Sequence, residues 1–423
     1  MSLTQLDNSL IWHPFTQMAL EPFAIPIVAG KDALLETESG EFIIDAISSW
    51  WVNVHGHAHP KIACAIATQA AKLEQVIFAG FTHPPAIALA SKITQKLPGP
   101  LKKVFFSDNG STAVEVALKM AIQFNTNKSQ KKCRLIAFEN AYHGDTFGAM
   151  SVGASGTFTL PYRDFLFDVA RIRAPYPGCE EAAHQDLQRE IEAGGAIALI
   201  YEPLVQGAAG MLMHNPIGLS NLLETAKKSG LILIADEVMT GFGRTGTLFA
   251  SEQLTTTPDI ICLSKGLTGG FLPLGLTVCA EQIYEGFLSE DRSKMFFHSH
   301  SFTANPISCA AALASIGIFE EQDTWENISR IQSSHEQFVH EMQFHSRFVN
   351  PRQCGTICAL DLIGGEATSY LNPLRDQIYQ LALENGVLLR PLGNVLYCMP
   401  PYCTQEVQLE RIYATIRKIA EKI

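Results

Sequence analysis

The stretch GLSNLLETAKKSGLILIADE, residues 218–237, decides the fold class. Its first half places apolar residues at helical spacing, and two lysines followed by Gly230 indicate a helix C-terminus. The apolar run from Leu231 to Asp236 that follows is typical of a buried strand. Because another such run, Ala196 to Leu204, precedes the helix, the stretch predicts a strand–helix–strand (βαβ) unit.

Short apolar runs recur through the middle of the chain, and each indicates a buried strand. They are Lys103 to Ser107, Arg134 to Phe138, Ala196 to Leu204, Leu231 to Asp236, Ile260 to Ser264 and Leu274 to Cys279. Strands that alternate with helices predict an α/β fold, in which helices cover both faces of a mostly parallel sheet and ligands bind beyond the carboxyl ends of the strands. We predict a large domain over residues 61–320 and a smaller α+β domain that combines residues 321–423 with the N-terminal arm, residues 1–60.

The composition argues against several classes of partner. The 423-residue chain has a formal net charge of −11 and no run of Lys or Arg, which argues against nucleic acid and anionic membranes. The N-terminal sequence has no secretory pattern, and no segment reaches the roughly 18 apolar residues of a membrane span. The 10 cysteines form no CxxC pair, so we expect reduced thiols, no metal centre and a cytoplasmic location.

Two acids, Asp236 and Glu237, stand at a strand end, where a parallel sheet presents side chains to its ligand. They fit the Walker B end of an ATPase, but that interpretation requires a GxxxxGK[ST] loop, which the sequence lacks. They also fit a pyridoxal-phosphate site, in which Asp236 would keep the pyridine nitrogen protonated. This second interpretation requires a lysine for the cofactor aldehyde and a cradle for the phosphate.

Both requirements have candidates in the sequence. The segment IICLSKGLTGG places Lys265 at the end of the next predicted strand, among apolar and small residues that would depress the pKa of its amine. The strand KKVFFS leads through a short loop to Gly110 and Ser111 and to a helix that begins near Thr112. Backbone N–H groups at such a helix N-terminus bind phosphate. Taken singly, a lysine is usually a surface residue and such a loop is usually only a helix cap.

Aromatic and histidine residues supply further candidates. Tyr142, in NAYHGDTFGAM, follows a predicted strand and would stack on a cofactor ring, and Trp50, in SSWWVNVHGHAHP, is the second aromatic candidate. Both fit a core position as well. His55, His57 and His59 are spaced like metal ligands, but no fourth ligand is apparent, so we expect helix caps and not a metal site.

The segment DEVMTGFGRTG, followed by PDIICLSKGLTGG, resembles the signature of the class III, fold-type I aminotransferases. The segments IWHPFTQM, SSWWVNVHGHAHP, YHGDTFGAMSVG, YEPLVQGAAGM and LRPLGNVLYCMPPY are similar, more narrowly, to the aminotransferases of biotin synthesis that act on 8-amino-7-oxononanoate. These segments run from residue 11 to residue 402, which is nearly the whole chain. The resemblance implies a mostly parallel seven-stranded sheet flanked by helices, pyridoxal 5'-phosphate as the cofactor, and a homodimer with shared active sites.

The resemblance also implies roles for the residues that match the cofactor site. Lys265 would hold the cofactor as a Schiff base and move protons, Asp236 would bind the pyridine nitrogen, and Tyr142 would stack on the ring. The phosphate would be bound by Gly110, Ser111 and, across the dimer, His300 and Ser301 of the HSHSFTANP segment.

The substrate site is implied in the same way. Its residues would be Phe15, Trp50, Tyr142, Lys265, Ser299 and Arg390. Arg390 would bind the carboxylate of 8-amino-7-oxononanoate as a bidentate pair, and Arg244 would lie near that site. Phe15 stands where the family has the tyrosine of WHPYT, and Ser299 with His300 stands where many members that use S-adenosylmethionine have Gly and Pro.

The implied reaction converts 8-amino-7-oxononanoate to 7,8-diaminononanoate by a ping-pong sequence, with S-adenosylmethionine or lysine as the amino donor. A second hypothesis is another class III enzyme, which acts on ornithine or another ω-amino acid, or a glutamate-semialdehyde aminomutase. Such aminotransferases commonly carry QGEGG or QGEAG, whereas residues 206–210 of this chain are QGAAG. A third hypothesis, a nucleotide-binding ATPase or a catalytically inactive binding protein, has no P-loop to support it.

Overall fold

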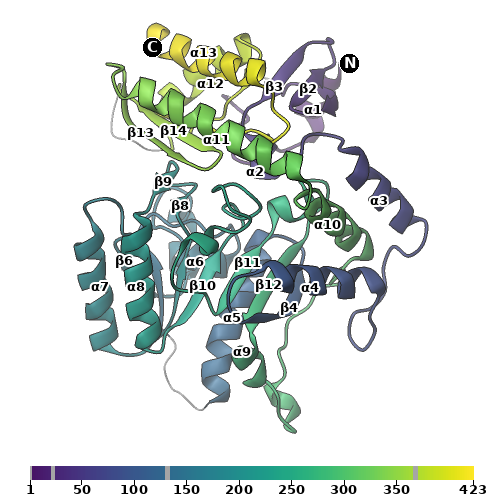
Figure 1. The fold of residues 1–423 in the computed structure, drawn as a ribbon, viewed down its shortest axis with the longest axis vertical. Helices are drawn as coiled ribbons and strands as arrows, with labels where there is room; N and C mark the ends of the chain where they lie inside the picture. The colour runs from purple at the N-terminus through teal and green to yellow at the C-terminus, as the bar shows by residue number, and fades with distance from the viewer. Residues whose placement is uncertain (1, 21–23, 129–133, 365–369) are drawn as a thin grey trace.

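The computed structural model describes residues 2–20, 24–128, 134–364 and 370–423. Its largest sheet has strands β4 (Leu101–Ser107), β5 (Arg134–Phe138), β6 (Val169–Ile172), β7 (Ala196–Tyr201), β10 (Ile232–Asp236), β11 (Ile260–Leu263) and β12 (Gly275–Ala280). The strand order is β4-β12-β11-β10-β7-β5-β6 (Figure 1). Strands β6, β5, β7, β10 and β11 pair in parallel, whereas β12 is antiparallel to both β4 and β11.

The predicted seven-stranded, mostly parallel sheet is therefore confirmed. All six apolar runs of the sequence form strands. The seventh strand, β6, escaped prediction because its sequence VARI is short and contains Arg171. The guanidinium of Arg171 donates to the carbonyl oxygens of Ser151 and Gly153, at 2.9 and 2.8 Å, so this charged residue is accommodated in the sheet by tertiary contacts.

Helices cover both faces of this sheet because successive side chains of each strand point to opposite sides. In β10, Ile232 and Ile234 join the apolar cluster of α5 (Gly110–Asn127), whereas Leu233 and Ala235 join that of α8 (Pro216–Lys228). The other helices around the sheet are α4 (Pro84–Lys96), α6 (Phe147–Val152), α7 (Glu180–Ala193), α9 (Glu281–Glu285) and α10 (Pro306–Ile318). The hairpin strands β8 (Val205–Gln206) and β9 (Leu212–Met213) lie outside the sheet.

The two ends of the chain meet in the smaller part of the molecule (Figure 1). One sheet there contains β1 (Ile27–Lys31), β2 (Leu34–Thr37), β3 (Phe42–Asp45) and β15 (Val387–Leu388), and another contains β13 (Phe348–Cys354), β14 (Ile357–Leu362) and β16 (Val395–Cys398). Their helices are α11 (Gln322–Met342), α12 (Leu374–Glu384) and α13 (Glu406–Lys422). The parallel pairing of β15 with β3 supports the assignment of both chain ends to one smaller domain, although the boundaries at residues 60 and 320 stay a prediction.

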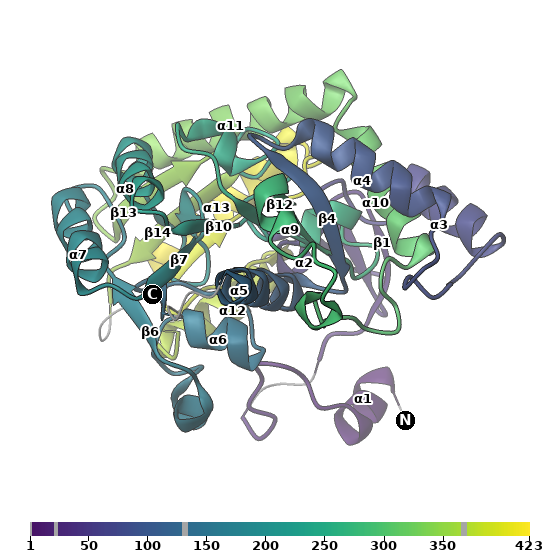
Figure 2. The same ribbon diagram turned by 90° about the horizontal axis from the view of Figure 1, so that it is seen from below.

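The N-terminal arm begins with α1 (Leu3–Leu10), which starts at a Ser2 capping box and buries none of its residues. It lies at the edge of the molecule in the view of Figure 2. Further along, α2 (Ser48–Trp51) and α3 (Pro60–Ala70) connect the arm to the large sheet. None of the helices within the described residues has the length and the apolar character that a bilayer span requires.

Candidate active site

A cavity of about 470 Å³ lies beyond the carboxyl ends of the parallel strands. The loops after β4, β5, β10 and β11 supply one wall, and the N-terminal arm and α2 supply the other. Seven of the residues predicted from the sequence line it, namely Phe15, Trp50, Gly110, Ser111, Tyr142, Asp236 and Lys265. The fold thus brings the predicted cofactor residues together, as expected for the ligand-binding edge of a parallel sheet.

The N-terminus of α5 has the form of a phosphate cradle. The Asn109 side chain caps the helix by accepting a hydrogen bond from the Thr112 N–H at 2.9 Å. The N–H groups of Gly110 and Ser111, in the first turn, have no acceptor inside the helix and carry the positive end of its dipole. A Cβ at position 110 would meet Val238 Cγ1 at 2.6 Å, so only glycine fits there without a shift. These features suit an anionic group at this helix end.

Asp236 is held in place by two donors. Its Oδ2 lies 2.7 Å from His143 Nδ1, and its Oδ1 accepts from the Val238 N–H at 3.1 Å. Both side chains are buried, and His143 Nε2 has no hydrogen-bond partner among the described residues. A carboxylate fixed in this way at a strand end can bind a protonated ring nitrogen. The sequence gives no signal for the role of His143, since its contact with Asp236 spans 93 positions of the chain.

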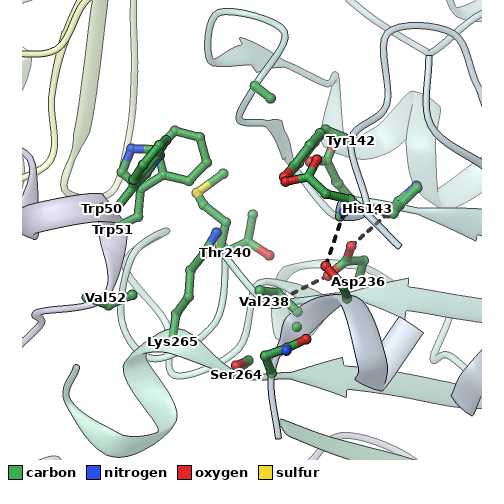
Figure 3. A pocket seen from close by; sticks show the side chains of 18 of the residues that line it. Trp50, Trp51, Val52, Tyr142, His143, Asp236, Val238, Thr240, Ser264 and Lys265 are labelled. Carbon is green, nitrogen blue, oxygen red and sulfur yellow. Dashed lines mark hydrogen bonds and ion pairs between the residues drawn. The ribbon is translucent and has the colours of Figure 1, made fainter. Parts of the chain in front are cut away.

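Lys265 begins a short 3-10 turn directly after β11 and has a positive φ of 48°. Burial lowers the pKa of its amine to about 8, while the charges of Asp236 and Glu202 act in the opposite direction. The amine lies 4.6 Å from the centre of the Trp51 ring, and Figure 3 shows it pointing to the side of the two tryptophans. A lysine with such a pKa supplies both a neutral amine and an ammonium near neutral pH.

The Trp51 ring that faces Lys265 is oriented by a hydrogen bond to Tyr397 of β16, in the smaller part of the molecule. Its indole N–H donates to the Tyr397 hydroxyl at 3.0 Å, a buried bond between residues far apart in sequence. The backbone here has positive φ angles of 52° at Ser48, 60° at Ser49 and 67° at Trp51. Non-glycine residues adopt such angles at a cost of about 1 kcal/mol or more each, which the surrounding contacts must offset. Asp45 supplies one of these stabilising contacts, since its Oδ2 accepts a hydrogen bond from the Ser49 N–H at 2.6 Å.

Two ionisable residues line the cavity: Tyr142, which was predicted from the sequence, and Glu202, which was not. Burial, and then the charge of Asp145, raise the pKa of the Tyr142 hydroxyl, which therefore stays protonated. Glu202 also lines the cavity, and burial followed by the charge of Asp236 raises the pKa of its carboxyl well above the usual range. Its Oε2 is buried without a hydrogen-bond partner among the described residues. The motif YEPLVQGAAGM contains Glu202, but no rule for its spacing pointed to the cavity.

The predicted substrate residues form an aromatic rim. The Phe15 ring lies 5.5 Å from Trp50, 5.6 Å from Phe158 and 6.3 Å from Tyr370, measured between ring centres. The Arg390 guanidinium lies 5.0 Å from the centre of the Trp50 ring, just outside the residues that line the cavity. A cation beside an apolar, aromatic channel suits a long aliphatic ligand that ends in a carboxylate.

Residues 299–301 do not line the cavity of their own chain. Ser299 Oγ and the His300 N–H each lie 3.2 Å from Thr303 Oγ1, and the Ser301 carbonyl accepts from the Gln75 side chain at 2.9 Å. Their predicted contact with a partner's cofactor therefore stays a prediction.

Arg244 is fully buried behind the cavity. Its guanidinium donates to the carbonyl oxygens of Pro400, at 3.0 Å, and Trp51, at 3.4 Å. It therefore supports the segment that carries the two tryptophans and does not line the cavity itself.

The histidines of HGHAH make separate contacts. His55 Nε2 lies 3.0 Å from Ser315 Oγ, and His57 Nε2 lies 2.9 Å from Asp45 Oδ2. Within the described residues, one group of potential metal ligands is close together, at His335, Cys358 and Cys398. Both ring nitrogens of His335 already have partners, Tyr413 at 2.7 Å and the Thr356 carbonyl at 3.2 Å. This group is therefore explained by packing.

Comparison with known proteins agrees with the geometry. The sequence matches the family Aminotransferase class-III over residues 16–420. It is 48% identical to the adenosylmethionine-8-amino-7-oxononanoate aminotransferase of Synechococcus elongatus, across 98% of this chain and 99% of that protein. The protein of the same name from Aquifex aeolicus is 37% identical, across 98% of this chain and 96% of its own length.

Solved structures show the same fold. The adenosylmethionine-8-amino-7-oxononanoate aminotransferase of Methanocaldococcus jannaschii has a TM-score of 0.94 at 33% identity and covers 99% of this chain and 98% of its own. An omega transaminase from Pseudomonas jessenii, solved in complex with PMP, has a TM-score of 0.94 at 24% identity and covers 100% of this chain and 98% of its own. The predicted fold-type I architecture is confirmed, and the chain belongs to the class-III aminotransferase family.

Proposed function

We propose that the protein transfers an amino group to 8-amino-7-oxononanoate, giving 7,8-diaminononanoate in biotin synthesis, with pyridoxal 5'-phosphate as cofactor and S-adenosylmethionine as donor. The observation that carries this proposal is the convergence of Lys265, Asp236 and the α5 N-terminus on one cavity. The names of the relatives that match along nearly the full chain support the substrate and the donor.

The residues of the cavity fit the cofactor. Bound pyridoxal phosphate supplies an electron sink that stabilises negative charge on the carbon next to the reacting amine. Asp236, fixed by His143, would hold a proton on the ring nitrogen through its carboxylate. The free N–H groups of Gly110 and Ser111 would bind the phosphate, and the Tyr142 ring would cover one face of the pyridine.

Lys265 is the residue placed to move protons. With its pKa lowered to about 8, the amine can take a proton from the donor carbon and later return it to the acceptor side. The Trp51 ring beside the amine stabilises the ammonium form by a cation–π contact. Lys265 can thus alternate between two protonation states without leaving the cavity.

The aromatic rim fits the acceptor substrate. Phe15 and Trp50 would pack against the aliphatic chain of 8-amino-7-oxononanoate, and Arg390 would bind its carboxylate. Phe15 has no hydroxyl, so it contributes packing only at this position. Ser299 lies outside the cavity of its own chain, so a role with substrate would require the partner subunit.

We also propose a homodimer in the cytoplasm. The N-terminal arm exposes large apolar side chains, with Trp12 87% and Leu20 83% accessible, and such surfaces are typical of association sites. Phe297 and Phe302, which flank the segment of His300 and Ser301, are also exposed, in keeping with contact between that segment and the partner's site. Nine cysteines of the described residues are free thiols, which suits a reducing compartment.

The second hypothesis, a class III enzyme for ornithine or another ω-amino acid, is not favoured. The segment QGAAG lacks the glutamate of the ornithine-type motif. The relatives that match along nearly the full chain are named for 8-amino-7-oxononanoate and not for ornithine. The ATPase hypothesis is excluded by membership of the aminotransferase family.

A single-turnover spectrum tests the proposal. The cofactor-loaded enzyme is mixed separately with 7,8-diaminononanoate, S-adenosylmethionine, lysine and ornithine. We expect 7,8-diaminononanoate and S-adenosylmethionine each to convert the absorption band of the aldehyde form to that of the amine form. Conversion by ornithine alone would contradict the proposed substrate, and conversion by lysine in place of S-adenosylmethionine would contradict the donor.

A further inference from the structure

Glu202 is a buried acid in the cavity wall that the proposed proton transfers do not use. Its side chain is 5% accessible, and its Oε2 has no hydrogen-bond partner among the described residues. The buried Glu237 differs, because its two carboxylate oxygens accept from the Ala250 and Ser251 N–H groups at 2.7 and 2.8 Å. Glu237 is therefore explained by packing, whereas Glu202 has an unused polar atom beside a ligand site.

The sheet places Glu202 directly beside Asp236. Ala235 of β10 pairs with Tyr201 of β7, so the residues that follow them, Asp236 and Glu202, stand next to each other at the carboxyl ends of these strands. Ala235 and Tyr201 both join the apolar cluster of α8 on one face of the sheet. Because side chains alternate along a strand, Asp236 and Glu202 both point to the opposite face, and both line the cavity.

Of these two neighbouring carboxyls, Glu202 is the one that keeps a proton. Burial, followed by the charge of Asp236, raises the pKa of the Glu202 carboxyl well above the usual range. Two backbone N–H groups and the charge of Lys265 act in the opposite direction as smaller effects. Asp236 already has His143 and the Val238 N–H as donors, which stabilise its charged form. Glu202 can therefore offer an O–H group to a ligand.

The order of the strands determines how pyridoxal phosphate would face these residues. Along β4-β12-β11-β10-β7 the sheet presents, in turn, the α5 N-terminus, Lys265, Asp236 and Glu202 (Figure 1). In the cofactor, the aldehyde and the ring nitrogen lie at opposite ends of the ring, and the phosphate arm and the ring hydroxyl flank the aldehyde on opposite sides. With the phosphate at α5, the aldehyde at Lys265 and the nitrogen at Asp236, the ring hydroxyl would fall on the side of β7.

We propose that Glu202, as a neutral acid, donates a hydrogen bond to the ring hydroxyl oxygen of the cofactor. This inference rests on the cofactor of the proposed function and not on its substrate. The ring oxygen carries its full negative charge when the neighbouring Schiff-base nitrogen on Lys265 is unprotonated. A donor to that oxygen stabilises this form, so Glu202 lowers the pKa of the nitrogen.

Thr240 is the rival donor. It also lines the cavity, and its Oγ1 is buried without a hydrogen-bond partner among the described residues. It belongs to the segment after β10, and in the view of Figure 3 it lies beside the Lys265 amine. The strand order thus favours Glu202, which follows β7, as the partner of the ring hydroxyl. Thr240→Val removes the rival hydroxyl and is part of the test.

The test is a spectral pH titration of the cofactor-loaded protein without substrate. The absorption band of the Schiff base changes when its nitrogen loses its proton, so the titration reports the pKa of that nitrogen. We expect Glu202→Met, which removes the donor, to raise this pKa by about 1 or more, the effect of one hydrogen bond to a charged group. Glu202→Gln retains a neutral donor and should leave the pKa nearly unchanged.

Glu237→Gln is the matched control, since it changes a buried glutamate next to Asp236 that is absent from the cavity wall. The pKa should stay nearly unchanged in this variant and in Thr240→Val. Cofactor content after gel filtration and the circular dichroism of the bound cofactor show that each variant is loaded and folded. Glu202→Leu replaces Glu202→Met if the latter does not take up cofactor.

Three results would overturn the inference. They are an unchanged pKa in the apolar Glu202 variant, a rise in Thr240→Val in its place, and a fall in Glu202→Gln. The fall would show that Glu202 is an ionised carboxylate, whose removal makes the protonated nitrogen less stable. If the unaltered protein forms no Schiff-base band, the proposed cofactor and this inference both fail. If the band forms, the Glu202 variants decide this inference, and reaction with 7,8-diaminononanoate separately decides the proposed substrate.

Discussion

The cofactor side of the cavity and its substrate rim are built in different ways. The cofactor side uses short segments that directly follow strands β4, β5, β10 and β11, so its residues are fixed by one rigid sheet. The rim combines Phe15 of the N-terminal arm, the strained segment at Ser48–Trp51, and Tyr370 and Arg390 of the C-terminal part. The chemistry is thus anchored in the large sheet, whereas the recognition of substrate depends on contacts between distant parts of the chain.

The largest effect should come from the cofactor side. Among the described residues that line the cavity, Lys265 is the one lysine, and Lys265→Ala removes it, so we expect turnover to fall by about 10⁴-fold or more. The cofactor should still bind, because the α5 N-terminus and Asp236 are unchanged. Turnover with 7,8-diaminononanoate and the cofactor content after gel filtration are measured together. Substantial remaining turnover would place the chemistry on another residue.

Asp236→Asn should have the next largest effect. It removes the negative charge that would keep the ring nitrogen protonated, and losing one preorganised electrostatic partner typically costs about 100- to 1,000-fold in rate. His143→Gln serves as the graded comparison, because it removes the 2.7 Å contact and leaves the carboxylate. Single-turnover rates should fall in the order unaltered enzyme, His143→Gln, Asp236→Asn. Equal rates for Asp236→Asn and the unaltered enzyme would contradict the assigned role.

A rim substitution should affect one substrate only. Arg390→Leu removes the cation beside Trp50, and loss of a charge-assisted bond worth about 1.5–3 kcal/mol should raise the KM for 8-amino-7-oxononanoate roughly 10- to 100-fold. The half-reaction with S-adenosylmethionine is measured alongside, since the carboxylate of that donor lies next to its reacting amine and not at the end of a long aliphatic chain. Equal losses in both half-reactions would show that the rim does not separate the two substrates.

The pKa of Lys265 predicts a pH dependence of cofactor attachment. Since burial lowers this pKa from 10.5 to about 8, the neutral amine predominates above about pH 8. The rate at which apoenzyme incorporates pyridoxal phosphate should fall about tenfold for each pH unit below that value and level off above it. Stopped-flow absorbance over pH 6 to 10 measures the profile. A rate that keeps rising to pH 10 would indicate an ordinary exposed lysine.

The smallest expected effect on turnover belongs to Tyr397→Phe. This change leaves the buried Trp51 indole N–H without its 3.0 Å acceptor, which should lower the free energy of unfolding by about 1–3 kcal/mol. Turnover should fall only about two- to threefold, since the Trp51 ring keeps its packing against Lys265. Tyr413→Phe, which loses a similar buried bond to His335 away from the cavity, is the matched control. Urea denaturation and turnover are measured on both variants, and an unchanged rate in Tyr397→Phe would exclude a positioning role.

The same contrast explains how far the sequence alone could be interpreted. An apolar run precedes each of Asp236, Lys265 and Gly110, which predicted that all three follow strands of one sheet. Because ligands bind at the carboxyl ends of parallel strands, the sequence also predicted that these residues meet at one cavity. The pairing of His143 with Asp236 and of Trp51 with Tyr397 depends on tertiary distances that no local pattern encodes.

The rim was predictable only by resemblance. Phe15, Trp50 and Arg390 carry no local signal for their role, and they meet because chain ends fold together through β3 and β15. Phe158 and Tyr370 were not predicted at all, since the aromatic contact between them joins two segments far apart in the sequence.

The most direct test of the central claim locates the cofactor on the chain. The loaded enzyme is reduced with borohydride, digested, and the modified peptide is identified by mass spectrometry. The account predicts that the added mass lies on Lys265, in the segment IICLSKGLTGG, and that prior addition of 7,8-diaminononanoate prevents the modification. Modification of a different lysine, or none at all, would contradict the assignment of this cavity as the site of amino transfer.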